Sequence, residues 1–269
     1  MIGRGTLLRE RMEPNELQLK PIGVFNTAAR YPYDVPRQGA VAGDNVGVIR
    51  LYPEYADGLA DLDGFSHLWV LYWFHQNAGW HLKVRPPRHV ERKVGVFASR
   101  SPYRPNPIGM SAVRLQRIEK SEIWITGHDL LDGTPILDVK PYLPYADSFP
   151  DASLGWTGED DGHEYAVEFS EKAQRQLVWL EEHGVSCLRQ FALTQLGYEP
   201  LNAARHRLVT LPTGELALAY RTWRISFEVK DMHVWVTHIS SGYTEADLAV
   251  EEDKYHDKAV HRAFNQLRL

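Results

Sequence analysis

The chain has 269 residues, of which 43% are hydrophobic, with a single cysteine and a formal net charge of −5. This length and composition are typical of a globular protein with one large or two small cores. The lone Cys187 excludes an internal disulfide, a paired-cysteine redox centre and a cysteine-rich zinc site, and it favours a reducing compartment. The net negative charge argues against indiscriminate binding of nucleic acid.

The N-terminal residues 1–18 predict a flexible arm without the apolar segment of a secretory signal. The longest apolar run, "LWVLYWF" at 68–74, is far too short to cross a bilayer. We therefore expect a cytoplasmic protein that does not enter the membrane.

Short strands separated by turn signals follow from Pro21. Their spacing predicts an antiparallel β-barrel over residues 19–150 and not an array of strand–helix–strand units. The run at 65–75 predicts a buried strand that holds His67 and His75 on one face, and Val113, Leu115 and Ile118 share a face of a later strand. The predicted strands are "PIGVFNT", "NVGVIRLYP", "FSHLWVLYWFH", "KVGVFAS", "SAVRLQRIE", "SEIWITGH" and "TPILDVKPY".

A break in composition at 146–164, rich in glycine, serine and acidic residues, predicts the domain boundary. Ser170 predicts the start of a helix that stops at Gly184, and "VSCLRQFALTQLG" predicts a second helix. "ELALAYRTWRISFEVKDMHVWVTHIS" predicts two strands that turn near Lys230 and Asp231. The fold class is thus mainly β, or α+β: a β-barrel catalytic domain, a smaller α+β domain over 165–242 and a polar helical tail over 243–269.

The loop "SRSPYRPNPIGMS" at 99–111 combines three prolines with two arginines. Proline fixes φ, so this loop loses little entropy when it is ordered. A guanidinium on a stiff frame suits a carboxylate or a phosphate, which makes Arg100, Arg104 and Asn106 candidate ligand-binding residues. The alternative is a stiff barrel corner whose arginines point into water.

Basic residues gather at 82–104, where seven lysines and arginines, Arg92 and Lys93 among them, accompany only one acidic residue. A basic patch on an acidic protein predicts a specific polyanionic partner. A solvated loop face is the alternative.

Two polar positions on strands are further candidates. Asp138 and Lys140 lie on one face of a predicted strand, as a buried ion pair or as part of a site. His75 ends the apolar run, where strand ends commonly meet a site. His67 and His75 have no third ligand at a diagnostic spacing, so we expect no metal. Phosphate-loop, serine-elbow and Rossmann motifs are absent from the sequence.

Four motifs in order, "VPRQG", "FSHLWVLYWFHQ", "GVFASRSPYRPNPIGMS" and "DLLDGTPILDVKPYLPYAD", resemble the TrmO family over roughly residues 18–150. Its members are bacterial tRNA methyltransferases that methylate N6 of threonylcarbamoyl-adenosine at position 37, next to the anticodon. The resemblance implies S-adenosylmethionine as cofactor, a β-barrel catalytic domain and a homodimer.

The resemblance also implies roles for individual residues. The threonyl carboxylate of the substrate would bind Arg104, or an arginine of a partner subunit, and Asn106 belongs to the same substrate site. Arg92 and Lys93 would follow the phosphates of the tRNA anticodon stem-loop, and Trp73, Tyr103 and Tyr142 could stack on bases. The implied cofactor-binding residues are Arg37, Gln38, Gly39, Ala40, His75, Gln76, Arg100, His128, Asp129, Leu130 and Leu131.

The acceptor nitrogen must lose a proton during methylation, which calls for a base or a stabilising dipole. Asp138, Lys140 and Tyr142 are the catalytic candidates, and the sequence does not choose among them. The C-terminal part departs from the family, because "GYEPLNAARHR" stands where an Asp-Pro-Arg-Pro run is usual. The choice of tRNA is thus open, and two alternatives remain: a non-catalytic RNA- or nucleotide-binding barrel, and a methyltransferase for another small acceptor.

Overall fold

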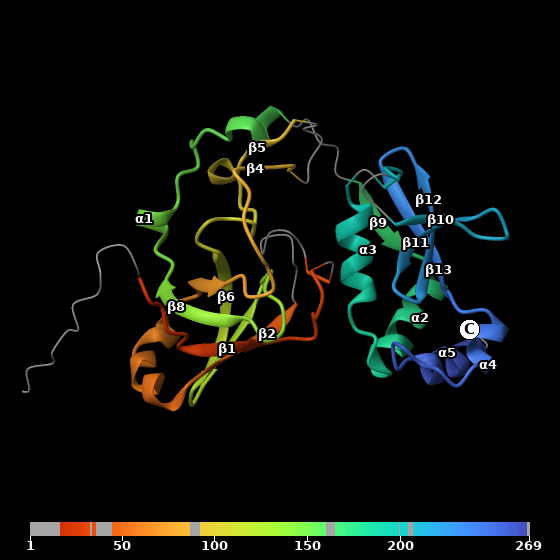
Figure 1. The fold of residues 1–269 in the computed structure, drawn as a ribbon, viewed down its shortest axis with the longest axis horizontal. Helices are drawn as coiled ribbons and strands as arrows, with labels where there is room; N and C mark the ends of the chain where they lie inside the picture. Colours follow the sequence, from red (N-terminus) through yellow and green to blue (C-terminus); the bar gives the residue numbers. More distant parts are fainter. Residues whose placement is uncertain are drawn as a thin grey trace, which may run out of the picture.

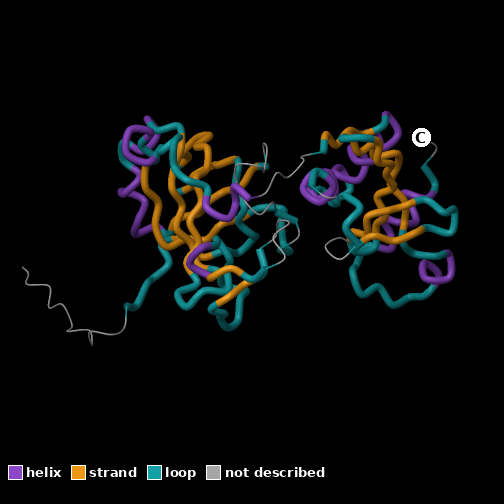
Figure 2. Tube along the Cα trace, turned by 90° about the horizontal axis from the view of Figure 1, so that it is seen from above, coloured by secondary structure: helices purple, strands orange, loops and turns teal. Residues whose placement is uncertain are grey.

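The computed structural model describes residues 17–32, 34–35, 45–86, 92–159, 165–198, 200–203 and 207–267. The chain forms two lobes that lie side by side, a barrel and a sheet covered by helices (Figure 1). The same division is visible after a quarter turn, with the strands of each lobe in orange (Figure 2).

The first lobe is a closed barrel of six strands in the order β1-β2-β7-β6-β3-β8, and all neighbouring strands are antiparallel. The antiparallel barrel predicted from the spacing of strands is confirmed. Phe25, Ile49, Leu68, Ile125 and Ile136 fill its interior and are fully buried. The strands are β1 (Gly23–Asn26), β2 (Val46–Leu51), β3 (His67–Trp73), β6 (Ile108–Glu119), β7 (Glu122–Thr126) and β8 (Pro135–Pro141).

Strand β3 is apolar on both faces. Leu68, Val70 and Tyr72 point into the barrel and are buried, while Trp69 and Trp73 lie on the outer face. The strand ends at Trp73, because the His75 N–H donates to the carbonyl oxygen of Trp73 and turns the chain. The prediction that His75 shares a strand with His67 is therefore wrong.

Strand β6 carries a β-bulge between Leu115 and Arg117. A bulge adds one residue and changes which side chains face inward. Val113 lies in the barrel core, and Leu115 and Ile118 pack against that core although they are an odd number of residues apart. The bulge explains the imperfect alternation of this strand.

A two-stranded sheet of β4 (Lys83–Val84) and β5 (Val94–Gly95) extends from the barrel. Val84, Val94 and Val96 form a small cluster of their own, with Trp156 against it. The strand predicted for "KVGVFAS" ends early, because a turn of 3₁₀ helix takes over at Val96. The remaining short helices of this lobe are η2 (Pro53–Leu59), η3 (Leu62–Gly64), η4 (Val96–Ala98), α1 (Pro144–Asp147) and η5 (Gly155–Glu159).

The second lobe is a mixed sheet in the order β10-β11-β12-β13-β9, in which only the β13–β9 pair is parallel. Helices α2 and α3 bury their apolar faces in the core of this sheet. The elements are β9 (Ala166–Phe169), α2 (Glu171–Glu182), α3 (Leu188–Leu196), β10 (Leu208–Thr210), β11 (Leu216–Tyr220), β12 (Trp223–Lys230) and β13 (His233–Ser241).

Three strands replace the two predicted for 215–240. The predicted turn at Lys230–Asp231 is present, with Asp231 at φ 53°. A second turn at Arg221 and Thr222 was missed; Arg221 takes φ 50°, which few non-glycine residues adopt. A tight turn without glycine, proline or asparagine leaves a weak signal in the sequence.

Helix α2 begins and ends where the sequence predicts. The Ser170 side chain accepts a hydrogen bond from the backbone N–H of Ala173 at 3.0 Å, which caps the first turn. Gly184 follows the last turn with φ 84°, the left-handed conformation that ends many helices.

The tail forms two short helices, α4 (Glu245–Ala249) and α5 (Lys258–Asn265), so the prediction of one polar helix is wrong. Helix α4 ends at Val250, which is extended. The Asp253 carboxylate then accepts the N–H groups of Asp257 and Lys258, both at 3.1 Å, and so starts α5. Local side-chain capping thus divides the segment.

Among the described residues, no helix combines the length and the apolar character that crossing a bilayer requires.

Candidate binding site at the mouth of the barrel

The loop between β7 and β8, residues 127–134, is held in place by Asn45. The Asn45 side-chain oxygen accepts the N–H groups of Gly127 at 3.1 Å and of His128 at 3.3 Å. Its amide nitrogen donates to the carbonyl oxygen of His128 at 2.9 Å. One side chain thus satisfies three backbone groups of the loop and fixes its conformation.

The same loop is tied to the segment that follows β1. The Asp132 carboxylate accepts the Thr27 N–H at 3.1 Å and the Asn26 side-chain amide at 3.3 Å. The Asp132 N–H donates to the carbonyl oxygen of Ala29 at 2.7 Å. The two loops therefore form one bonded unit at this end of the barrel.

A chain of polar groups runs from this loop into the barrel. Ser111 of β6 donates its hydroxyl proton to the Asp129 carboxylate at 2.5 Å. The hydroxyl oxygen of Tyr72 in β3 lies 3.2 Å from that of Ser111, and because the single O–H of Ser111 already donates to Asp129, Tyr72 is the donor there. Tyr72 and Ser111 are only 5% and 6% exposed, so the chain is screened from solvent at its inner end.

Burial has the largest effect on the pKa values of the two titratable groups in this cluster, Asp129 and Tyr72. Burial raises the pKa of the Asp129 carboxyl, while the hydrogen bond from Ser111 and the charge of Arg100 oppose the rise. Burial and the nearby Asp129 raise the pKa of Tyr72 well above its ordinary value, so the phenol stays protonated. A half-buried carboxyl thus lies within the field of an exposed arginine.

His128 lies in the same loop with its side chain fully buried. Its Nε2 is 3.4 Å from the Thr27 hydroxyl, and its ring meets Phe25 edge-on with centroids 4.6 Å apart. Burial lowers the pKa of His128 to about 4. The imidazole is therefore neutral at pH 7.

The predicted cofactor residues fall into three groups. Arg37, Gln38, Gly39 and Ala40 lie outside the described residues. Arg100 and Asp129 are linked electrostatically, because the charge of Arg100 lowers the pKa of both Asp129 and Tyr72. His75 and Gln76 lie in the turn after β3.

Leu130 and Leu131 of the same loop differ in their surroundings. Leu130 is 1% exposed and belongs to the barrel core, whereas Leu131 is half-buried. Of the two, only Leu131 is partly exposed, and cofactor binding by both residues stays a prediction.

The predicted substrate residues lie on the proline-rich loop and beside β5. Arg104 donates from Nη1 to the carbonyl oxygens of Ser99 at 2.9 Å and Ser101 at 3.3 Å, and so braces its own loop. Asn106 is exposed, as are Arg92 and Lys93 just before β5. The stiff loop and the basic segment are thus both at the surface.

Two of the three predicted catalytic residues, Asp138 and Lys140, lie on β8, and Tyr142 follows its last residue. Asp138 Oδ2 and Lys140 Nζ are 2.7 Å apart, with side chains 44% and 61% exposed, so the pair is a surface ion pair and not a buried one. The Tyr142 ring packs against Trp69 with centroids 5.4 Å apart. Asp138 and Lys140 lie on the opposite side of the strand from the inward-pointing Val139, which packs against the core.

Sequence reasoning missed Tyr72, Ser111 and Asn45. A usable signal existed for two of them: alternation along β3 and β6 places Tyr72 and Ser111 on the inward face, where a polar side chain needs a partner. Asn45 carried no such signal, because its role depends on a loop 82 residues further along the chain.

Among the described residues, no group of three or more histidine, cysteine or acidic side chains is arranged to hold a metal ion.

Comparisons with known proteins agree with this architecture. The family model described as the tRNA-methyltransferase O N-terminal domain matches residues 24–148. The tRNA (adenine(37)-N6)-methyltransferase of Escherichia coli (strain K12) is 39% identical over 225 residues, 80% of this chain and 93% of that protein. A putative S-adenosylmethionine-dependent methyltransferase, RcsF, of Pseudomonas aeruginosa is 43% identical over 171 residues, 62% of this chain and 72% of that protein.

Solved structures give the same answer. The crystal structure of TrmO from Pseudomonas aeruginosa aligns with a TM-score of 0.61 and 30% identity, covering 85% of this chain and 100% of that chain. A barrel built from the same segment, and a relative matched over nearly its whole length, lead to one conclusion: the chain belongs to the tRNA-methyltransferase O family, TrmO.

Proposed function

We propose that this chain is an S-adenosylmethionine-dependent methyltransferase that methylates N6 of adenosine 37 in tRNA. Family membership supports the reaction, since the chain matches 93% of the length of the Escherichia coli tRNA (adenine(37)-N6)-methyltransferase. The observation that carries the proposal is the polar cluster at the barrel mouth, where Arg100 and Asp129 come from two of the segments predicted to bind the cofactor.

The residues present fit the cofactor. S-adenosylmethionine has an amino-acid end with both charges, and Arg100 and Asp129 offer a guanidinium and a carboxyl that complement them. When bound, the cofactor supplies an electrophilic methyl group on a positively charged sulfur. The fixed 127–134 loop and the neutral His128 would line its binding site, so that little reorganisation is needed. We include Arg37–Ala40, His75 and Gln76 as further cofactor-binding residues.

We infer that the acceptor is N6 of threonylcarbamoyl-adenosine. This nitrogen carries a carbonyl substituent, so its proton is more acidic than that of adenine, and it must leave as the methyl group arrives. Asp138, Lys140 and Tyr142 remain the candidates for accepting the proton or stabilising the charge. Their surface position supports contact with a large substrate.

The tRNA anticodon stem-loop would bind across the exposed loops beside the site. Arg92 and Lys93 are exposed next to β5, and Tyr103 is 43% exposed, available for stacking on bases. We assign Arg104 and Asn106 to the substrate site, with Arg104 acting also as a brace of its loop.

We propose a homodimer that works in the cytoplasm. An apolar patch on the outer barrel face supports the dimer: Trp73 pairs with Ile108 across the β3–β6 ladder, next to Met110, and all three are at least 37% exposed. The single cysteine supports a reducing compartment. In this proposal residues 19–150 form the cofactor-binding domain, 165–242 a smaller domain and 243–269 an added tail.

The test is methyl transfer from labelled S-adenosylmethionine to tRNA that carries threonylcarbamoyl-adenosine, followed by digestion to nucleosides. We expect label in the modified adenosine, none with tRNA lacking the threonylcarbamoyl group, and at least a tenfold loss in Arg100→Ala. Arg175→Ala, an exposed arginine on α2, is the matched control and should keep full activity.

The alternatives predict other outcomes of the same assay. Tight cofactor binding without transfer to any tRNA, but with transfer to a small acylated adenosine, would identify a methyltransferase for another acceptor. Absence of cofactor binding in calorimetry would leave a non-catalytic RNA-binding barrel and would contradict the proposal.

A further inference from the structure

The segment between β1 and β2 contacts both lobes. We define its described residues 27–32, 34 and 35 as the bridging segment. On the barrel side, Thr27 and Ala29 hydrogen-bond to Asp132 of the 127–134 loop at 3.1 and 2.7 Å. In Figure 1 the segment lies on the side of the barrel that faces α3. Its conformation is therefore coupled directly to the candidate cofactor loop.

Asp34 connects this segment to the second lobe through a side-chain hydrogen bond. It is 5% exposed, and its Oδ2 accepts the N–H groups of Arg30 at 3.0 Å and Tyr31 at 2.9 Å, which fixes a turn within the segment. Its Oδ1 accepts the hydroxyl of Tyr220 at 2.7 Å, across 186 residues of sequence. A buried carboxylate with both oxygens bonded resists movement, because breaking either bond leaves a buried charge with fewer partners.

Arg221 adds a second contact beside the first. Its guanidinium lies 5.0 Å from the Tyr31 ring of the bridging segment and 5.2 Å from the Tyr255 ring of the tail. The Cys187 thiol donates to the carbonyl oxygen of Ala28 at 3.8 Å, and burial raises its pKa to about 11, so it stays a neutral donor. Three separate positions of the second lobe thus contact the bridging segment.

The turn at Arg221 and Thr222, between β11 and β12, is also bonded to the tail. Thr222 donates to Asp257 Oδ2 at 2.7 Å, and its hydroxyl oxygen lies 3.0 Å from Nε2 of the buried His261. His261 stacks on Trp223 with ring centroids 3.7 Å apart. Tyr220, Arg221 and Thr222 therefore join barrel, sheet and tail through three consecutive residues.

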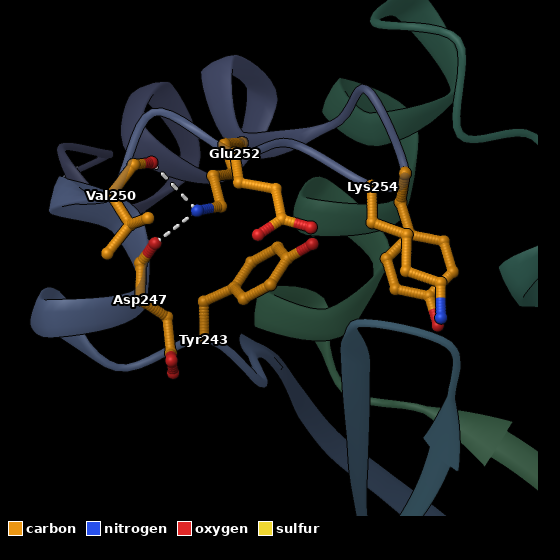
Figure 3. Close-up of a pocket in the computed structure, with 7 residues that line it drawn as sticks. Tyr243, Asp247, Val250, Glu252 and Lys254 are labelled. Carbon is orange, nitrogen blue, oxygen red and sulfur yellow. Dashed lines mark hydrogen bonds between the residues drawn. The ribbon is translucent and has the colours of Figure 1, made fainter.

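The tail segment that carries Tyr255 is itself fixed. Lys258, which is 6% exposed, donates from Nζ to the main-chain carbonyl oxygens of Asp247 and of Val250, the latter at 2.9 Å, as the dashed lines in Figure 3 mark. Tyr255 lines a cavity of about 240 Å³ next to these groups. The tail segment whose Tyr255 ring lies beside Arg221 is thus held in place by hydrogen bonds of its own.

We propose that Tyr220 and Arg221 are positioning residues, which hold the bridging segment and through it the 127–134 loop in the arrangement that binds the cofactor. This inference rests on the proposed function, because it takes these two loops as cofactor-binding. It gives the second lobe a role in the reaction that the barrel alone does not provide. Neither residue touches the reacting atoms in this role.

The test is calorimetric binding of S-adenosylmethionine to the full chain and to Tyr220→Phe. Loss of one hydrogen bond to a buried carboxylate should raise the dissociation constant and the KM for the cofactor about 3- to 30-fold, with a smaller change in kcat. Ser170→Ala is the control, since it also loses side-chain hydrogen bonds, to the carbonyl oxygen of Thr237 and from the Ala173 N–H, but inside the second lobe and away from the turn at Arg221 and Thr222. It should lower the melting temperature without changing cofactor affinity by more than twofold.

The outcomes separate the two proposals. Wild-type protein that does not bind the cofactor contradicts the proposed function and this inference with it. Wild-type binding with an unchanged Tyr220→Phe overturns this inference alone, and so does an equal weakening in Ser170→Ala, which would mean a general loss of stability.

A double substitution tests whether the two side chains act through their bond. Asp34→Asn and Tyr220→Phe should each weaken cofactor binding, and the double variant should be weakened by clearly less than the product of the two effects. Fully multiplicative effects would show that the side chains act independently and would contradict the proposal.

Discussion

Asp129 and Asp138, two carboxyl groups of the barrel lobe, lie in very different environments. Asp138 forms an ion pair with Lys140 in which both side chains are about half exposed, and such pairs contribute about 0 to 1 kcal/mol to stability. Desolvation raises the pKa of Asp129, and the hydrogen bond from Ser111 and the charge of Arg100 offset only part of that rise. Groups with perturbed pKa values cluster at functional sites, which is why we place the cofactor at Asp129.

Replacing Ser111 by alanine should make Asp129 harder to ionise. The Ser111 hydrogen bond lowers the pKa of this carboxyl against the effect of burial, so its loss should raise that pKa further. If cofactor binding needs ionised Asp129, the acidic limb of kcat/KM against pH moves to higher pH in Ser111→Ala. Because the folded-state pKa is raised, the variant should also be less stable than the wild type at pH 7.

The control for this experiment is Ser226→Ala, which removes another buried serine hydroxyl, in the second lobe. Its pH profile should coincide with that of the wild type. A Ser111→Ala profile that also coincides with the wild type would exclude ionised Asp129 from the reaction.

At the level of secondary structure, the pairing of β3 with β6 leaves space for the Tyr72 ring of the candidate site. Gly109 of β6 lies opposite Tyr72 of β3, and a Cβ placed at Gly109 would be 2.3 Å from the Tyr72 ring. A side chain at this position would push the ring aside and break its contact with Ser111. The glycine is thus required by a close approach between two strands, and not by an unusual φ angle.

We expect Gly109→Ala to destabilise the protein by about 1 to 3 kcal/mol, the usual cost of overpacking, and to weaken cofactor binding together with it. Urea unfolding and calorimetry measure the two effects. Gly95→Ala is the control, because an added Cβ there meets open space at φ −61°. If the Gly109→Ala variant had the same free energy of unfolding as the Gly95→Ala variant, the result would contradict the close approach of Gly109 to the Tyr72 ring.

Among the described residues, the two larger apolar cores are separate, and each has a fully buried histidine beside it. His128 belongs to the barrel lobe and His261 to the tail that packs on the second lobe. Burial lowers the pKa of each to about 4, and for His261 it outweighs the attraction of Asp257. Both rings are therefore neutral in the folded protein at pH values where an unfolded histidine, with a pKa of about 6.5, already binds a proton.

Stability should therefore fall as the solution is acidified from about pH 6.5 to pH 4. In this window the unfolded state binds more protons than the folded state, so each proton taken up favours unfolding. Scanning calorimetry from pH 8 to pH 4 should show a falling melting temperature. His261→Gln should flatten the pH dependence of the second lobe, whereas His81→Gln, at an exposed site, should leave it unchanged. A melting temperature that is constant down to pH 4.5 would contradict the buried, neutral state of both rings.

The sequence by itself determined the features that depend on neighbouring residues. Short strands between turn signals predicted the barrel, Ser170 and Gly184 predicted both ends of α2, and four ordered motifs predicted the family. These signals work because side-chain periodicity, capping and glycine conformation act over a few residues. The tail was predicted as one helix because its capping carboxylate, Asp253, looks locally like any other acidic residue of a polar helix.

Only the tertiary structure decided which side chains meet. Tyr72 reaches Ser111 and Asp129 because β3 pairs with β6 and the β7–β8 loop closes over their ends. Asp34 and Tyr220 are 186 residues apart and share no local pattern. Contacts of this kind follow from strand pairing and from the packing of one lobe against another, and because those are long-range, no spacing in the sequence encodes them.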